Sequence, residues 1–234
     1  MNSEIKATGA ASVFVPDHKL FAEGELGAVL EWEVKNSAGV LMTDPRTGEL
    51  NRGKKKAESF VRQFMELVAG IFAHPCEAYP ISVRDTGNVV QGVITCRDTY
   101  TGEYHYLFIA NAALGTTTIG IVAGTGAVAP TINDYALGTL IAHGVGAGQL
   151  SYSAMTFGTP AADASTSHFT CTRNLANNSG GAITVNEIGL YVKAYETPTY
   201  TTTYHMILRD VIGGGINVPN GQTLTINYRP IATV

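Results

Sequence analysis

Residues 28–35 read Ala28-Val29-Leu30-Glu31-Trp32-Glu33-Val34-Lys35, and this stretch sets the fold class. Ala28, Leu30, Trp32 and Val34 alternate with Val29, Glu31, Glu33 and Lys35, which is the period of a strand with one buried face. The turn residues 36–39 follow, and residues 40–43 are predicted to return as the second arm of a hairpin.

Similar strand patterns recur to the end of the chain. Each is ended by Gly, Asn or Pro, and the last alternates Leu224, Ile226 and Tyr228 with polar residues. Several short strands at this spacing indicate a sandwich or a barrel. The further predicted strands cover residues 88–97, 104–110, 118–122, 149–157, 168–175, 182–195, 204–211 and 222–231.

One segment changes period. Between residues 55 and 73 the apolar residues recur every three or four positions, and His74-Pro75 ends the pattern. This spacing predicts an amphipathic helix of about five turns. The expected fold is therefore mainly β: an antiparallel β-sandwich or barrel, jelly-roll-like, with one amphipathic α-helix packed against it. The apolar positions of the helix are Phe60, Val61, Phe64, Leu67, Val68, Ile71 and Phe72.

Three parts of the chain are expected. Residues 1–20 form an extended N-terminal arm, residues 21–115 hold a β-hairpin, the helix and a second hairpin, and residues 116–234 form a C-terminal β-sandwich portion. The last two are expected to be continuous as one fold, because 234 residues suit a single all-β domain.

Composition narrows the function. Charged residues make up 15% of the chain and the formal net charge is -4. A nucleic-acid partner is not expected, because phosphate binding needs clustered Lys and Arg, and neither is a membrane partner, because no window has enough apolar residues to span one. The three cysteines and the absence of a signal-like N-terminus indicate synthesis in a reducing host cytoplasm.

Catalytic and cofactor motifs are scarce, so no enzyme activity, cofactor or metal is predicted. The six histidines lack the spacing of a compact metal site. A cupin-like enzyme would need His105, His205 and a carboxylate to converge on one metal. The glycine-rich residues 120–126 have no following helix to bind phosphate and are interpreted as a tight turn.

Four segments share one resemblance: residues 182–191 (AITVNEIGLY), 206–210 (MILRD), 218–225 (VPNGQTLT) and 59–64 (SFVRQF). They resemble structural proteins of tailed bacteriophage particles, and the C-terminal part of this pattern also resembles tail-fibre attachment proteins. The resemblance implies a virion location on the capsid surface, neck or tail, with the chain itself and other virion proteins as partners.

Glu187 breaks the alternation of its strand, because it stands between Val185 and Ile188. This slip predicts a β-bulge that redirects Leu190 and Tyr191. Glu187 is expected either to pair with Arg209 across the strands as a structural bond or to form a solvated pair of little energetic value.

The primary hypothesis is a non-enzymatic virion subunit that acts by self-association and by docking on other virion proteins, since charged residues are depleted in permanent interfaces. Val13, Phe14 and Phe21 of the N-terminal lead are candidate interface residues. The alternative is a fibre-type host-receptor or glycan-binding module, because four tyrosines surround a Thr-rich loop and aromatic rings bind sugars. These candidate glycan or interface residues are Tyr191, Tyr195, Tyr200 and Tyr204.

Overall fold

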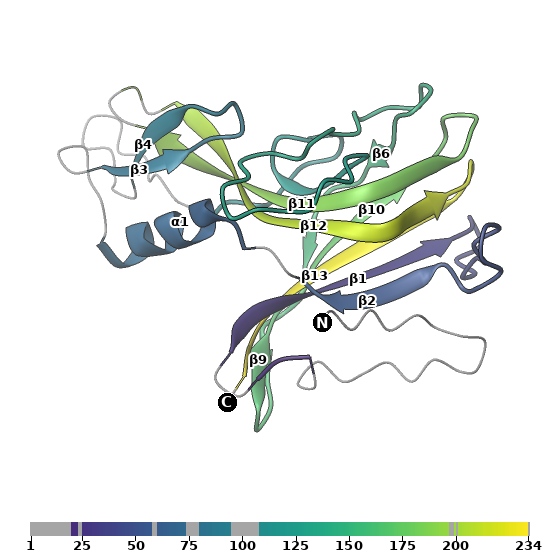
Figure 1. Ribbon diagram of the computed structural model, residues 1–234, viewed down its shortest axis with the longest axis horizontal. Helices are drawn as coiled ribbons and strands as arrows, with labels where there is room; N and C mark the ends of the chain where they lie inside the picture. Colours follow the sequence, from purple (N-terminus) through teal and green to yellow (C-terminus); the bar gives the residue numbers. More distant parts are fainter. Residues whose placement is uncertain are drawn as a thin grey trace.

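A computed structural model describes residues 20–22, 25–57, 60–73, 80–94, 108–196, 199 and 201–233. It is mostly β, with two antiparallel sheets and a single short helix (Figure 1). The predicted fold class is therefore confirmed.

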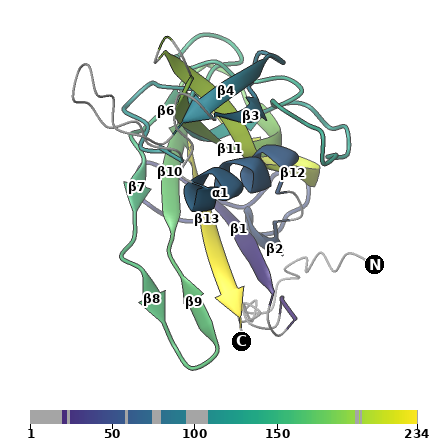
Figure 2. The same ribbon diagram turned by 90° about the vertical axis from the view of Figure 1, so that its left-hand side faces the viewer.

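The first sheet is built around the last strand. Strand β13 (Thr223–Thr233) lies between β1 (Leu26–Lys35) and β10 (Cys171–Ala176), and β2 (Arg52–Lys56) covers the other edge of β1. On the far side, β6 (Ser151–Tyr152) and β7 (Thr156–Phe157) pair with β10. The hairpin of β8 (Ala161–Ala162) and β9 (Thr166–His168) runs beside the end of β13 (Figure 2).

The second sheet contains the two longest strands. Strands β11 (Ile183–Glu196) and β12 (Thr202–Val218) form a long hairpin, and β5 (Gly120–Gly124) pairs with the middle of β11. Strands β3 (Ile81–Arg84) and β4 (Val90–Ile94) form a short hairpin at one end, where helix α1 (Arg62–Ala73) contacts β3 and β12 (Figure 1). Both sheets take strands from both sides of residue 115.

One apolar core fills the space between the sheets. It takes Leu30 from β1, Leu208 from β12 and Ile226 from β13, all fully buried. The alternation of β1 is as predicted, because Ala28, Leu30 and Val34 join this core while Val29 faces the other way. There, Val29 packs with Phe21 and Ile231 in a small second cluster.

The predicted helix start is wrong. Residues 52–56 are an edge strand that pairs with β1, and the helix begins at Arg62. The charges explain the strand, because Lys54 lies directly opposite Glu31 in the ladder and its ammonium is 3.3 Å from that carboxylate. A pair of opposite charges in this position stabilises a sheet.

The other local predictions have mixed outcomes. Residues 40–43 return beside the end of β1 as predicted, but only briefly: Leu41 bridges Lys35, and the Met42 N–H donates to the Val34 carbonyl at 2.9 Å. Strand β4 pairs with β3, and most of the predicted strand at 104–110 lies outside the described residues. The predicted strand at 118–122 is found at 120–124, where it pairs in register with β11, so these residues are not the predicted turn.

Candidate functional site

Glu187 lies on β11 beside a bulge, and its carboxylate is fully buried. Three backbone N–H groups donate to it: those of Gly126 at 3.0 Å, Gly138 at 3.1 Å and Thr139 at 2.9 Å. These donors lie near the two ends of the loop of residues 125–139, which contains no helix or strand. The carboxylate therefore holds both ends of this loop against β11.

Arg209 on β12 completes this group. Its Nε donates to Glu187 Oε2 at 2.9 Å, its Nη1 to Asp134 Oδ2 at 2.6 Å and its Nη2 to the Val128 carbonyl at 3.1 Å. A bulge is found beside Glu187, but its extra residues lie on β12 and not, as predicted, on the strand of Glu187. Of the two expectations for Glu187 and Arg209, the buried structural bond is the one observed. We call Glu187, Arg209 and Asp134 the carboxylate latch.

The pKa of Asp134 follows from this geometry. Partial burial disfavours the ionised carboxylate, but hydrogen bonds from the backbone and hydroxyl of Thr131 and from Arg209 outweigh it and lower the pKa. Asp134 is therefore ionised at neutral pH, and its carboxylate is occupied with Thr131 and Arg209.

Arg173 on β10 is buried in a different way. Its guanidinium donates to the carbonyls of Ser153 (2.8 Å), Ile121 (2.9 Å) and Thr116 (2.6 Å), with two longer bonds to Ile119 and Ala113. We call this group the carbonyl cage. The ring of Tyr152 stacks 4.9 Å from the guanidinium carbon. Desolvation lowers the pKa of Arg173 to about 10.

Two more buried polar groups also have structural partners. The Tyr228 hydroxyl donates to Asp210 Oδ2 at 2.8 Å, and Lys55 Nζ from the other sheet lies 3.8 Å from Asp210 Oδ1. The imidazole of His205 bonds the Thr203 hydroxyl and the Arg84 carbonyl, both at 2.9 Å, and burial lowers its pKa. These contacts join neighbouring strands and sheets.

A metal site involving His105 and His205 is not assembled by the described residues. His105 lies outside them. Within the described ranges, no group of three or more His, Cys, Asp or Glu side chains is placed to bind a metal ion.

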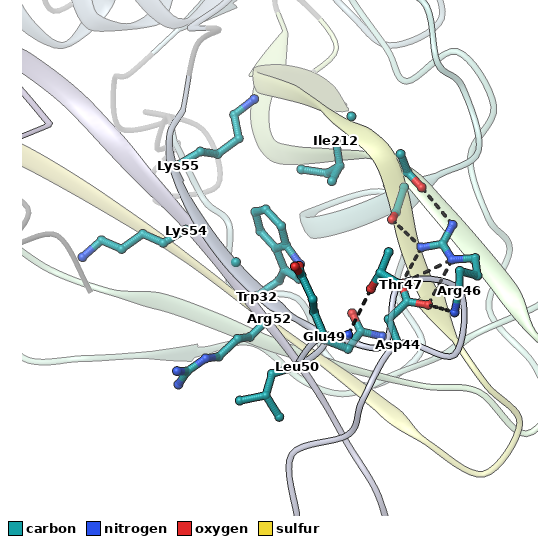
Figure 3. Close-up of a pocket in the computed structure, with 15 residues that line it drawn as sticks. Trp32, Asp44, Arg46, Thr47, Glu49, Leu50, Arg52, Lys54, Lys55 and Ile212 are labelled. Carbon is teal, nitrogen blue, oxygen red and sulfur yellow. Dashed lines mark hydrogen bonds and ion pairs between the residues drawn. The ribbon is translucent and has the colours of Figure 1, made fainter. Parts of the chain in front are cut away.

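An open cleft lies between the two sheets at the outer side of β12 (Figure 3). It has a volume of about 350 Å³, within the range of small-molecule sites. Its walls are the segment from Asp44 to Lys55 and the segment from Ile212 to Gly215, and Trp32 of β1 lies between them. We call it the Trp32 cleft.

A wide bulge in β12 shapes one wall of the Trp32 cleft. Val185 pairs with Ile216 and Glu187 with Val211, so residues 212–215 stand opposite Asn186 alone. Gly214 and Gly215 have φ values of 78° and 65°, which glycine adopts without strain. The bulge thereby exposes a run of main chain on the cleft wall.

Arg46 fastens this bulge to the opposite wall. Its guanidinium donates to the carbonyls of Gly214 at 2.8 Å and Gly215 at 2.9 Å, and to Asp44 Oδ2 at 2.7 Å (Figure 3). The hydrogen bond from Arg46 lowers the pKa of Asp44. The width of the cleft is therefore fixed by bonds already made within the chain.

Several large apolar side chains are exposed on α1. Phe72 is 86% exposed, Met65 61% and Ile71 55%. Met65, Ala69 and Phe72 follow one another at helical spacing along the outer surface, while Leu67 on the opposite side is fully buried. The helix is thus apolar on both its inner and its outer face.

The three predicted interface tyrosines that the structure describes are buried or half-buried. Tyr191 lies in the core, where its hydroxyl accepts the Leu137 N–H at 2.7 Å. Tyr195 and Tyr204 are half-buried, and Tyr204 packs against the core. Tyr200 lies outside the described residues.

Of the candidate residues in the N-terminal lead, only Phe21 is described. It is buried, because its ring lies flat against Gly27, where any side chain would collide with it. It also stacks with Lys56, whose ammonium is 4.9 Å from the ring centre. Val13 and Phe14 lie outside the described residues.

Comparisons with known proteins found no matching family model, no matching curated protein and no matching solved structure. No helix in the described ranges has the length and apolar character needed to cross a bilayer.

Proposed function

We propose that this chain is a non-enzymatic structural subunit of a tailed-phage virion, on the capsid surface, neck or tail. It is made in the host cytoplasm and acts by self-association and by docking on other virion proteins. The resemblance of residues 182–191 and the three companion segments to such proteins motivates the assignment.

The observation that carries the self-association is the outer face of α1. An isolated surface helix normally presents charged and polar groups to water. Here, Met65, Ala69 and Phe72 occupy that face, and Phe72 has 86% of its surface exposed. Covering such a face removes apolar area from water and is favourable by about 25 cal/mol per Å². A second copy of the chain is the proposed cover.

The interior supports a structural role as well. The latch, the cage and the pair of Tyr228 and Asp210 place ionisable groups on strands and loops that they hold in position. A general acid or base needs access to a reacting group. These buried groups are already occupied with internal partners, so they suit a subunit whose shape must persist in an assembly.

Quantitative mass spectrometry of purified tailed-phage particles, grown from a genome that encodes this chain, tests the location. The expected result is a fixed copy number of the chain in every particle. Its absence from intact infectious particles would overturn the proposed function.

Analytical ultracentrifugation of the full chain tests the contact surface. We expect a concentration-dependent oligomer that Phe72→Ser weakens by about tenfold or more in dissociation constant, as for a residue at the centre of an interface. Val145→Ser is the matched control, because Val145 is also well exposed but lies on a separate loop. Equal effects of both substitutions, or a monomeric parent chain, would contradict the role of α1.

A further inference from the structure

We infer that the Trp32 cleft binds an uncharged sugar ring through the face of Trp32 and acceptor groups on the Asp44–Leu50 wall. This binding site is independent of the virion assignment, since it depends only on the geometry of the cleft. It also differs in place from the tyrosine cluster that the sequence suggested.

The cleft contains an aromatic surface of the right kind. The indole of Trp32 lies directly over Gly53 on the neighbouring strand, where a Cβ atom would come within 2.1 Å of the ring. The absence of a side chain at Gly53 therefore leaves room for the ring against β2. Trp32 also lines the cleft, and an aromatic face stacks well on the C–H face of a pyranose because both are flat and apolar.

The charges of the walls favour a neutral ligand. Four cations line the cleft, and three of them have a carboxylate beside them: Arg46 with Asp44 at 2.7 Å, Lys54 with Glu31 at 3.3 Å and Lys55 with Asp210 at 3.8 Å. Arg52 is the fourth. In Figure 3 the ammonium end of Lys54 points away from the group around Arg46. An anion would therefore meet a charge that is already balanced at three of the four cations.

The groups left to bind a ligand are mainly acceptors. Glu49 lines the cleft, and its carboxylate has no hydrogen bond or ion pair with any residue in the described ranges. The exposed Thr47 hydroxyl stands beside it and accepts the Glu49 N–H at 3.3 Å. A ligand that donates several hydrogen bonds from hydroxyl groups and lacks negative charge matches this set.

The walls are also held in place before binding. Arg46 ties the turn at Asp44 to the bulge at Gly214 and Gly215, and the Asn51 side chain donates to the Asn217 carbonyl at 2.6 Å. A preformed site loses less conformational entropy when the ligand binds. The volume of about 350 Å³ leaves room for a ligand of one or two rings.

Trp32 is the single tryptophan of the chain, so its fluorescence reports on this cleft alone. We would titrate the full chain with the methyl glycosides of glucose, galactose, mannose and N-acetylglucosamine, and with glucuronate as the charged counterpart. The expected result is a saturable change in emission with at least one neutral glycoside and at least tenfold weaker binding of glucuronate. We expect a Kd of about 1 mM, so the emission change should saturate below about 50 mM.

Glu49→Gln tests the acceptor while leaving the fold intact, because Glu49 has no internal partner in the described ranges to lose. We expect it to weaken glycoside binding by about tenfold, the usual effect of losing one hydrogen bond to a charged group. Glu33→Gln is the matched control, because Glu33 lies on β1 outside the cleft lining and pairs with Lys35. Glu33→Gln is expected to bind the glycosides as tightly as the parent chain does.

Three results would overturn the inference. One is no saturable response to any neutral glycoside. Another is tighter binding of glucuronate than of the neutral rings. The third is equal binding by the parent chain and Glu49→Gln. None of these results bears on the presence of the chain in virions, so the two proposals fail separately.

Discussion

The two buried arginines of this protein hold loops in opposite ways. Arg209 in the carboxylate latch faces two acidic side chains, Glu187 and Asp134. Arg173 in the carbonyl cage faces only main-chain oxygens from five residues. The pKa shifts differ accordingly: hydrogen bonds to its acids raise the pKa of Arg209 against the effect of burial, whereas desolvation lowers that of Arg173.

The different partners of the two arginines predict how much a substitution in the latch or in the cage destabilises the fold. In the latch, removal of one partner leaves an uncompensated charge in the interior, which is among the most costly single changes. In the cage, removal of the Arg173 cation leaves neutral carbonyl groups and no unpaired charge. A carbonyl oxygen that loses one hydrogen bond costs less than a buried charge without a partner, because it has a second lone pair. The latch should therefore be the more sensitive of the two.

The largest effect is expected for Glu187→Ala. It leaves buried Arg209 with Asp134 alone among the acids of the latch and removes the acceptor of the Gly126, Gly138 and Thr139 amides. The free energy of unfolding should fall by about 3–5 kcal/mol. Urea unfolding measures the loss, and hydrogen exchange at these amides should accelerate. Glu33→Ala on the half-exposed face of β1 is the control, with an expected change within about 0.5 kcal/mol. A loss below about 1 kcal/mol for Glu187→Ala would contradict the latch.

A smaller loss is expected for Arg173→Met, which keeps the apolar stem and removes the five donors of the cage. We expect a decrease of about 2 kcal/mol in the free energy of unfolding. The lost hydrogen bonds destabilise the fold, and removal of a buried cation that was costly to desolvate offsets part of this loss. The same urea titration compares it directly with Glu187→Ala. If Arg173→Met proved the more damaging, the proposed difference between latch and cage would be wrong.

The smallest effect concerns pH. The pKa of folded Asp134 lies below its ordinary value of 3.8. Its ionised form therefore contributes stability above that pH, and the contribution is lost as the pH falls through the folded pKa. Asp134→Asn should cost less than about 1 kcal/mol at pH 7, because the carboxyl is partly exposed.

Urea unfolding of the parent chain and of Asp134→Asn at pH 7 and at pH 2.5 tests this expectation. The difference in their free energies of unfolding should be smaller at pH 2.5. Arg173→Met provides the contrast, since the carbonyl partners of Arg173 do not titrate. Its cost, relative to the parent chain, should be the same at both pH values. If Asp134→Asn lost more free energy of unfolding at pH 2.5 than at pH 7, the lowered pKa of Asp134 would be contradicted.

The latch was partly predictable from the sequence, and the cage was not. Glu187 interrupts a strict alternation, and that interruption indicates both a bulge and an unusual side chain. Arg173 gives no comparable signal, because its partners are main-chain carbonyls spread over residues 113–153, and any residue type can supply a carbonyl. Only the three-dimensional path of the loop brings them together.

The start of the helix was missed for a related reason. Lys54, Lys55 and Lys56 suit the first turn of a helix by composition, but Lys54 stands opposite Glu31 in the ladder and Lys55 reaches Asp210. The alternation of acids in β1 with the basic residues of 52–56 was the available signal. No signal in the sequence indicated the Trp32 cleft. Its two walls come from segments about 160 residues apart, and they face each other only because β2 and β12 belong to different sheets.

The position of β13 in the middle of the first sheet has a consequence for synthesis on the ribosome. Lys35 of β1 pairs with Thr223, about 190 residues further along the chain. At roughly 5–20 residues per second, the nascent β1 must wait about 10–40 s for its inner neighbour to emerge. During that delay the unpaired edge of β1 can pair with a wrong strand, so chaperones that bind newly made chains should strongly influence the yield of this protein.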